Sequence, residues 1–170
     1  MKRLILIRHA KSSWDFGGLS DHERPLNPRG QEACSRIAGW LQKNDYRPDE
    51  VLCSTATRCR ETYDRIAAKM GLDVPISHLQ NLYHASAESL LACLRSAEGE
   101  TVMMLAHNPG IGDFAALIHA HPLPQTQQFA LYPTAATTVM DFDIADWTEA
   151  AWDTGKGLGF VIPRELEPHA

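Results

Sequence analysis

Short hydrophobic runs alternate along this chain with segments whose apolar residues recur at helical spacing. Polar clusters bound the hydrophobic runs, as they bound buried strands, and the runs cover 2–7, 50–53 and 101–106. Helical spacing predicts four helices, which cover 28–43, end at Gly71, centre on 90–94 and follow Pro109. Later strands are expected at 136–142 and 158–162, with 146–156 as a connection between them. Residues 11–28 show neither period and predict a loop.

This order of strands and helices predicts a mostly parallel sheet with helices on both faces. We therefore expect an α/β fold, a three-layer α/β/α sandwich. The 170 residues are the size of one domain and contain no internal repeat, linker or low-complexity segment. A single domain over 1–170 is the prediction.

Composition and charge exclude several classes of protein. Hydrophobic residues make up 44% of the chain and charged residues 22%, which is typical of a folded globular protein. The net charge of −5 provides no overall positive field for nucleic acid. No apolar run approaches the ~20 residues that span a bilayer, and the run after Met1 stops at Arg8, too early for a signal peptide. We expect a cytoplasmic protein that binds neither membranes nor nucleic acid.

Cysteine and histidine spacing gives no sign of a metal site. The four cysteines lack the close paired spacing of zinc ligands and are too few for a disulfide framework, so buried reduced thiols are expected. His119 and His121 flank one alanine as a metal pair does, but they follow a predicted helix, where a cationic histidine is ordinarily favourable. Neither a metal nor a cofactor is expected.

Three predicted strands end in polar residues of a kind that binds anions. Arg8 and His9 follow the first strand. Ser54 and Arg58 follow the second strand, and His107 follows the third. Because ligands bind beyond the carboxyl ends of parallel strands, these side chains are expected to converge at one edge of the sheet. Guanidinium forks match tetrahedral oxyanions, so phosphate is the predicted ligand.

The segment after the third strand adds to this predicted anion site. Asn108 as cap and Pro109 at the first helical position would start a helix with free backbone N–H groups facing the site, which makes Asn108 a candidate phosphate ligand. His9 among such donors is a candidate nucleophile, which would attack phosphorus and then be freed by water. Taken singly, each of these residues also fits an ordinary structural role.

At these positions the chain resembles the histidine phosphatase superfamily, whose members have the phosphoglycerate mutase fold. The resemblance spans about residues 1–120 in four ordered blocks, which are Arg8-His9-Ala10, Arg24-Pro25-Leu26 with Gly30, Ser54 with Arg58 and Thr62, and His107-Asn108-Pro109. The opening through Trp14 and the segment 21–26 are most similar to SixA-type phosphohistidine phosphatases. The resemblance implies that His9 is phosphorylated, that no metal is required, and that the phosphoryl group is bound by Arg8, Arg58 and His107.

Two departures from the family pattern affect the expected chemistry. Ala10 replaces the signature glycine, a change that is tolerated unless this residue needs a positive φ. Larger relatives carry a carboxylate proton donor where this chain has Leu82-Tyr83-His84. Imidazole leaves phosphorus without a strong acid, because its ring can be protonated near neutral pH, and the short connection over 76–86 leaves no room for a lid. Both features favour a phosphohistidine protein as substrate.

Several accessory assignments stay open. His84 fits a weak acid, a specificity contact or loop surface. Ser12 and Arg24 either line the site or hold the loop together, and Arg60, which competes with Arg58, is expected to face solvent. Four aromatic residues fit either a docking surface or a cover for the core, namely Trp14, Phe16, Trp147 and Trp152.

The leading functional hypothesis is a metal-independent phosphatase that acts through phosphorylated His9 on a phosphorylated histidine phosphotransfer protein in signal transduction. One alternative is a phosphatase for small phosphoesters. A mutase is less favoured, since it needs a donor acid and an enclosed site. The other alternative is a phosphoprotein-binding module without turnover, against which His9 itself argues, because an anion receptor needs only arginines and N–H donors.

Overall fold

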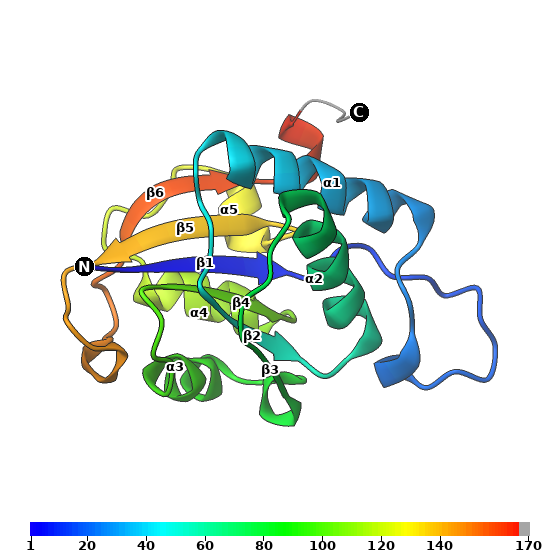
Figure 1. Cartoon of the computed structure of the whole chain (residues 1–170), viewed down its shortest axis with the longest axis horizontal. Helices are drawn as coiled ribbons and strands as arrows, with labels where there is room; N and C mark the ends of the chain where they lie inside the picture. Colours follow the sequence, from blue (N-terminus) through cyan, green and yellow to red (C-terminus); the bar gives the residue numbers. More distant parts are fainter. Residues whose placement is uncertain (167–170) are drawn as a thin grey trace.

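The computed structural model describes residues 1–166 and shows a six-stranded sheet with helices on both faces (Figure 1). The strands are β1 (Lys2–Arg8), β2 (Glu50–Ser54), β3 (Ile76–Leu79), β4 (Thr101–Ala106), β5 (Thr137–Phe142) and β6 (Lys156–Val161). They lie in the order β3-β2-β4-β1-β5-β6. β1, β2, β3 and β4 are parallel, whereas β5 is antiparallel to its neighbours β1 and β6. The predicted mostly parallel sheet is confirmed.

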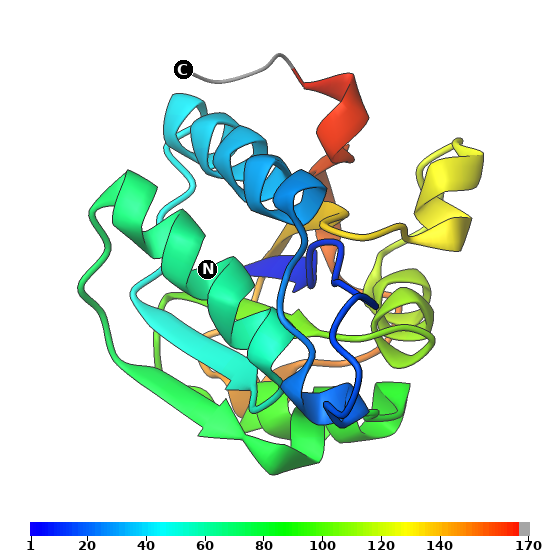
Figure 2. The ribbon, with the colours of Figure 1, turned by 90° about the vertical axis from the view of Figure 1, so that its right-hand side faces the viewer.

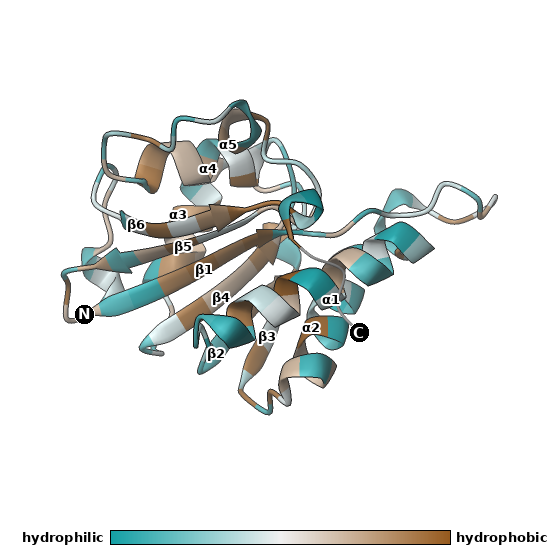
Figure 3. Cartoon of the chain, turned by 90° about the horizontal axis from the view of Figure 1, so that it is seen from above, coloured by the Kyte–Doolittle hydropathy of each residue, from teal (hydrophilic) through white to brown (hydrophobic). Residues whose placement is uncertain are grey.

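The helices form two outer layers, which Figure 2 and Figure 3 show from two directions. One face of the sheet is covered by α1 (Pro28–Lys43) and α2 (Thr57–Met70). The other is covered by α3 (Ala87–Arg95), α4 (Gly110–Ile118) and α5 (Gln127–Leu131). The three-layer α/β/α arrangement expected from the sequence is therefore present.

Side chains of β1 alternate between two hydrophobic layers. Ile5 and Ile7 pack with residues of α1 and α2, whereas Leu4 and Leu6 pack with residues of α3 and α4. All four are fully buried, because both faces of the central strand are covered. Figure 3 shows the apolar strands as a brown layer between the helices. β1 thus carries its last residues to the carboxyl edge from the middle of the sheet.

The helix ends follow local sequence signals. The side-chain oxygen of Asn27 accepts a hydrogen bond from the Gly30 N–H at 2.8 Å, and Pro28 takes the first position of α1. Gly71 ends α2 with a φ of 67°, in the left-handed region where glycine is favoured. These two helices begin and end as their sequences predict.

Two elements differ from the sequence prediction. The expected connection over 76–86 is wrong at its start, because Ile76–Leu79 forms β3. This four-residue strand lies at the sheet edge with its middle residues exposed, so it lacks the hydrophobic run that marks a buried strand. α5 also escapes prediction, since five residues with one buried side chain, Phe129, are too few to show a period.

Two further expectations concern the cysteines and the length of the helices. All four cysteines are buried and unpaired, as predicted. Within residues 1–166, no helix is both long and apolar enough to span a bilayer.

Candidate active site

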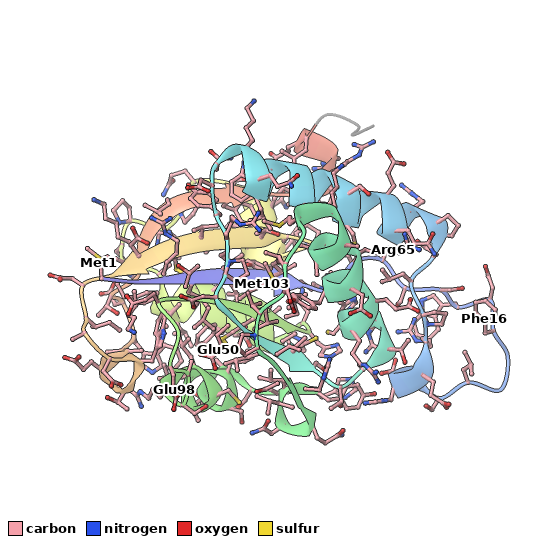
Figure 4. The ribbon with its side chains drawn as sticks, in the orientation of Figure 1. Met1, Phe16, Glu50, Arg65, Glu98 and Met103 are labelled. Atoms are coloured by element: carbon pink, nitrogen blue, oxygen red, sulfur yellow. The ribbon has the colours of Figure 1, made fainter. Side chains whose placement is uncertain are left out.

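A hollow of about 290 Å³ lies at the carboxyl ends of β1 and β4, and Arg58 of α2 also lines it. Because β1 lies beside β4 and β4 beside β2, the segments that follow these three parallel strands meet at one edge. Figure 4 shows Phe16 on the loop beyond this edge, while Met1 and Glu98 lie at the opposite end. The hollow is lined by eight of the residues that the sequence singled out, namely Arg8, His9, Ser12, Arg24, Arg58, His84, His107 and Asn108. Ser54, which was expected to join them, contacts His107 and does not line the hollow.

His9 is held as a neutral base. Its Nδ1 lies 2.7 Å from the carbonyl oxygen of Ala10, which can only accept, so Nδ1 carries the proton and Nε2 keeps its lone pair. Burial, together with the positive charges of Arg8 and Arg58 and against the opposing effect of the Ala10 carbonyl, lowers the pKa of His9 to about 3. The ring is therefore uncharged and nucleophilic at neutral pH.

The turn that carries His9 is fixed by α2. The Ala10 N–H donates to Thr62 Oγ1 at 3.0 Å, and that hydroxyl donates to the Arg58 carbonyl at 2.7 Å. Ala10 has no positive φ, so alanine serves here as well as the glycine of the family signature. Thr62 of the third sequence block thus ties His9 to the helix that carries Arg58.

His107 faces His9 from the end of β4, with 5.2 Å between the ring centroids. Ser54 Oγ lies 2.8 Å from His107 Nε2 and also accepts from the Ala56 N–H. We assign the serine hydrogen to the ring, which makes Nε2 the acceptor of this bond. Nδ1 then carries the proton of His107 and is a donor. Burial, followed by the effects of His9 and Arg58, lowers the pKa of His107 to about 2. A neutral hydrogen-bond donor thus lies beside His9.

Buried donors without a partner gather at this hollow. Among the described residues, three buried side-chain atoms make no hydrogen bond, and they are Arg8 Nε, Arg58 Nε and His107 Nδ1. Buried donors are nearly always paired in folded proteins, because an unpaired one costs about 1–3 kcal/mol. All three belong to residues that line the hollow, so the site is short of acceptors and suits an anion.

Asp21 organises the cationic side of the hollow, and the sequence did not single it out. Its backbone oxygen and Oδ2 accept from Arg58 at 2.7 and 3.0 Å, and its Oδ1 accepts from Arg24 at 3.1 Å. Oδ2 also accepts from the Tyr83 hydroxyl at 2.5 Å and lies 3.5 Å from His84 Nε2. The hydrogen bonds from Tyr83, Arg58 and Arg24 lower the pKa of Asp21, so its carboxylate is charged at neutral pH. Asp21 stands in the block that resembles the family, three residues before Arg24, and that spacing was the available signal.

Ser12 and Arg24 both line the hollow and brace its loop. Arg24 donates to Ser12 Oγ at 2.7 Å and to the Ser13 carbonyl at 3.2 Å. Its guanidinium carbon also lies 3.5 Å from the centroid of the Trp14 ring, a cation–π contact. Ser12 and Arg24 therefore fulfil both roles that the sequence left open, since they line the site and hold the loop together. Arg60 is exposed, as expected, while the side chain of Arg58 is 4% exposed.

The start of α4 departs from the prediction. Pro109 is the cap and the helix begins at Gly110, one residue later than expected. The N–H groups of Ile111, Gly112 and Asp113 already bind acceptors within residues 107–109, so the expected row of free backbone donors is wrong.

The Asn108 amide is also engaged within the chain. Its oxygen accepts from the Gly112 N–H at 3.2 Å, and its nitrogen donates to the carbonyls of Leu131 and Tyr132 at 3.1 and 3.0 Å. Both amide hydrogens are thereby used, and no donor of this side chain is free for a phosphate.

Comparison with known proteins identifies the family. The family model of the histidine phosphatase superfamily (branch 1) matches residues 4–87. An uncharacterised protein of Mycobacterium tuberculosis is 30% identical over 164 residues, which cover 93% of this chain and all of the relative. The chain belongs to the histidine phosphatase superfamily.

Solved structures agree with the assignment of this histidine phosphatase. A candidate phosphohistidine phosphatase SixA of Agrobacterium tumefaciens is 28% identical, with a TM-score of 0.75 over 95% of this chain and 98% of that one. A second candidate SixA, from Nakamurella multipartitia, is 24% identical, with a TM-score of 0.79 over 95% and 96% of the two chains. The phosphoglycerate mutase-like fold and the similarity to SixA-type proteins are therefore confirmed, and the chain is that of a phosphatase.

The structure also places the three other histidines that the sequence analysis considered. His84 borders the hollow with 59% of its side chain exposed and stacks on Tyr83 at 4.0 Å between centroids. His119 and His121 instead bind Ala120 O and Asp153 Oδ1. Among residues 1–166, no group of three or more His, Cys, Asp and Glu side chains is placed to hold a metal ion.

The structure divides the four aromatic residues whose role the sequence left open into two pairs. Trp147 is buried and Trp152 packs against Phe114 of α4, so these two cover the core. Trp14 and Phe16 are 79% and 56% exposed on the loop beside the hollow.

Proposed function

We propose that this histidine phosphatase removes the phosphoryl group from a phosphohistidine of a phosphotransfer protein, by way of a phosphorylated His9. The observation that carries the proposal is the state of His9. Its ring is neutral, its Nδ1 is fixed on the Ala10 carbonyl, and Arg8 and Arg58 line the same hollow. A neutral imidazole among fixed cations is suited to attack phosphorus, since the phosphoryl charge is stabilised on transfer.

The first step transfers the phosphoryl group to the protein. The lone pair of His9 Nε2 forms a bond to phosphorus while the P–N bond of the substrate breaks. The substrate imidazole takes that electron pair and leaves as a neutral ring when its other nitrogen carries a proton. Arg8 and Arg58 bind the phosphoryl oxygens, and His107 Nδ1 donates a further hydrogen bond.

The second step returns His9 to its starting state. Phosphorylated on Nε2 and protonated on Nδ1, the His9 ring is a cation, which the Ala10 carbonyl stabilises at 2.7 Å. Water attacks phosphorus, the N–P bond breaks, and its electron pair returns to Nε2. The oxygen and both hydrogens of the water leave as dihydrogen phosphate, so no acid or base is consumed.

A phosphohistidine substrate fits the way protons are supplied at this site. The family's donor carboxylate is replaced by Leu82-Tyr83-His84, and His84 is the imidazole that lines the hollow there. We assign His84, oriented by Asp21, as the accessory donor that gives the leaving imidazole the proton of its other nitrogen and takes one back from solvent after each turnover. An exposed imidazole suffices for a leaving imidazole, whereas an alkoxide needs a stronger acid.

No step requires a metal or a cofactor, and we propose that the enzyme works without either. The four buried thiols also suit a reducing compartment, so we propose the cytoplasm as its location and signalling as its role. Activity is expected to persist in excess EDTA, and a loss that Mg²⁺ or Zn²⁺ restores would refute metal independence.

The test compares the wild type with His9→Ala, and uses His78→Ala as a control because His78 is exposed on the edge strand β3. A histidine-phosphorylated phosphotransfer protein and p-nitrophenyl phosphate are supplied separately, and phosphate release is measured. Wild type and control should release phosphate from the protein and form an acid-labile phosphoenzyme, and His9→Ala should do neither. Turnover of the aryl phosphate alone would indicate a small-molecule phosphatase. Binding without release would indicate a phosphoprotein-binding module.

A further inference from the structure

A second and larger hollow adjoins the candidate active site. It encloses about 580 Å³ between the first turns of α3 and α4, compared with about 290 Å³ for the site of His9. His84 and Asn108 line both hollows, so the two lie side by side at these residues. The larger volume is within the usual range of ligand pockets. A substrate bound at His9 therefore extends naturally into this second hollow.

The second hollow, called the groove from here on, has an apolar floor. Ala85, Pro109, Ala116 and Leu117 supply apolar surface, and Leu117 is 46% exposed although it is a leucine. The start of α4 lies directly against the preceding loop, since a Cβ added at Gly110 would stand 1.8 Å from the Ala85 carbonyl oxygen. Close contact of these two backbones thus fixes the part of the groove at Gly110 and Ala85.

The walls of the groove carry negative charge. Glu88 projects from the first turn of α3 and Asp113 from the first turn of α4, and both are exposed. A carboxylate in a first turn stabilises its own helix, which accounts for each residue separately. Two helices nevertheless aim their acids at the same apolar hollow. Among the described ion pairs, neither carboxylate has a cationic partner.

The two hollows therefore carry charges of opposite sign. The site of His9 is lined by Arg8, Lys11, Arg24 and Arg58, and the groove by two carboxylates. A ligand that matches both has an anionic phosphoryl group beside a positive charge on an apolar stem. Lysine and arginine side chains have this form, since their methylenes cover apolar surface while the charged head reaches an acid.

We infer that the groove between α3 and α4 binds a lysine or arginine that flanks the phosphohistidine of the substrate protein. The inference rests on the proposed function and adds a rule of substrate selection to it. The phosphoryl group enters the cationic hollow, and the flanking basic side chain lies along Leu117 with its charge between Glu88 and Asp113. Electrostatic complementarity of this kind selects partners and speeds their encounter.

The test uses two synthetic peptides phosphorylated on a single histidine and identical except that lysines flank the histidine in one and glutamines in the other. The enzymes are the wild type, Glu88→Gln/Asp113→Asn, and the control Glu98→Gln/Asp143→Asn. Glu98 and Asp143 are exposed acids that follow α3 and β5, and Figure 4 shows Glu98 far from the loop of Phe16. The control removes the same charge from the opposite end of the molecule.

The wild type and the control are expected to prefer the lysine peptide by about 3- to 20-fold in kcat/KM, through KM, as two exposed ion pairs allow. Added salt should reduce this preference. The groove variant should lose it and keep the wild-type rate on p-nitrophenyl phosphate.

The groove assignment would be overturned if the wild type hydrolysed both peptides equally well, or if the groove variant still preferred the lysine peptide. Either result would leave the proposed function standing. Hydrolysis of neither peptide by the wild type would refute the proposed function, and the groove assignment with it. Phosphoethanolamine is a small ester that carries an ammonium group beside its phosphate. If its hydrolysis depended on Glu88 and Asp113 while that of the peptides did not, the groove would be a metabolite subsite and the protein assignment would be overturned.

Discussion

Replacing Asp21 with asparagine tests whether its carboxylate positions Arg58. The substitution keeps the shape of the side chain but removes the charge that accepts from Arg58 Nη2 at 3.0 Å and from the Tyr83 hydroxyl at 2.5 Å. A hydrogen bond to a charged group is worth about 1.5–3 kcal/mol. Because 41% of the Asp21 side chain is exposed, we reduce the expected loss to about 1–2 kcal/mol. This loss corresponds to about a 5- to 30-fold decrease in kcat/KM.

The assay is steady-state hydrolysis of p-nitrophenyl phosphate, together with inhibition by inorganic phosphate. In the proposed mechanism Arg58 binds the phosphoryl group before and during transfer, so Asp21→Asn should raise the inhibition constant of phosphate as well as lower kcat/KM. Asp15→Asn removes an exposed acid from the same loop and should change neither value more than 2-fold. The opposite reasoning holds that loss of a nearby negative charge strengthens anion binding. Tighter phosphate inhibition in Asp21→Asn would therefore refute the positioning role.

Three further predictions concern stability and reactivity. Burial lowers the pKa of His9 to about 3 and that of His107 to about 2, so below about pH 6.5 the unfolded chain takes up protons that the folded one does not. The free energy of unfolding should fall between pH 6.5 and pH 4.5 by about 1–3 kcal/mol per histidine, and urea titrations in which His107→Asn does not flatten this fall would contradict the assignment. Gly110→Ala should lower the thermal midpoint by several degrees, since its Cβ would meet the Ala85 carbonyl oxygen at 1.8 Å, and an unchanged midpoint would show that the two backbones separate easily. Burial raises the pKa of Cys59 to about 12, so this thiol should react with iodoacetamide only after unfolding in urea, and rapid labelling of the native protein would disprove its burial.

Local pattern was sufficient for the main elements and for the residues of the hollow. β1, β2 and β4 are buried on both faces and stand out as hydrophobic runs, and α1 shows its buried face in its period. Once these strands are parallel, the polar residues that follow them must share one edge. Arg8, His9, Arg58 and His107 could be placed for this reason.

Elements without a hydrophobic signature could not be predicted from the sequence. β3 is exposed at the edge of the sheet, and the start of α4 depends on side-chain bonds of Asn108 that a cap pattern does not specify. Neither feature leaves a repeating trace in the chain.

What the sequence determined by itself was the set of buried strands and helices and the group of residues at their carboxyl ends, because burial imposes a period on the chain. The tertiary structure alone decided that Asp21 reaches Tyr83 across 62 positions, and that Glu88 and Asp113 face one groove. Exposed polar side chains that meet through folding are under no periodic constraint. Their partners are set by how the loops and helices pack.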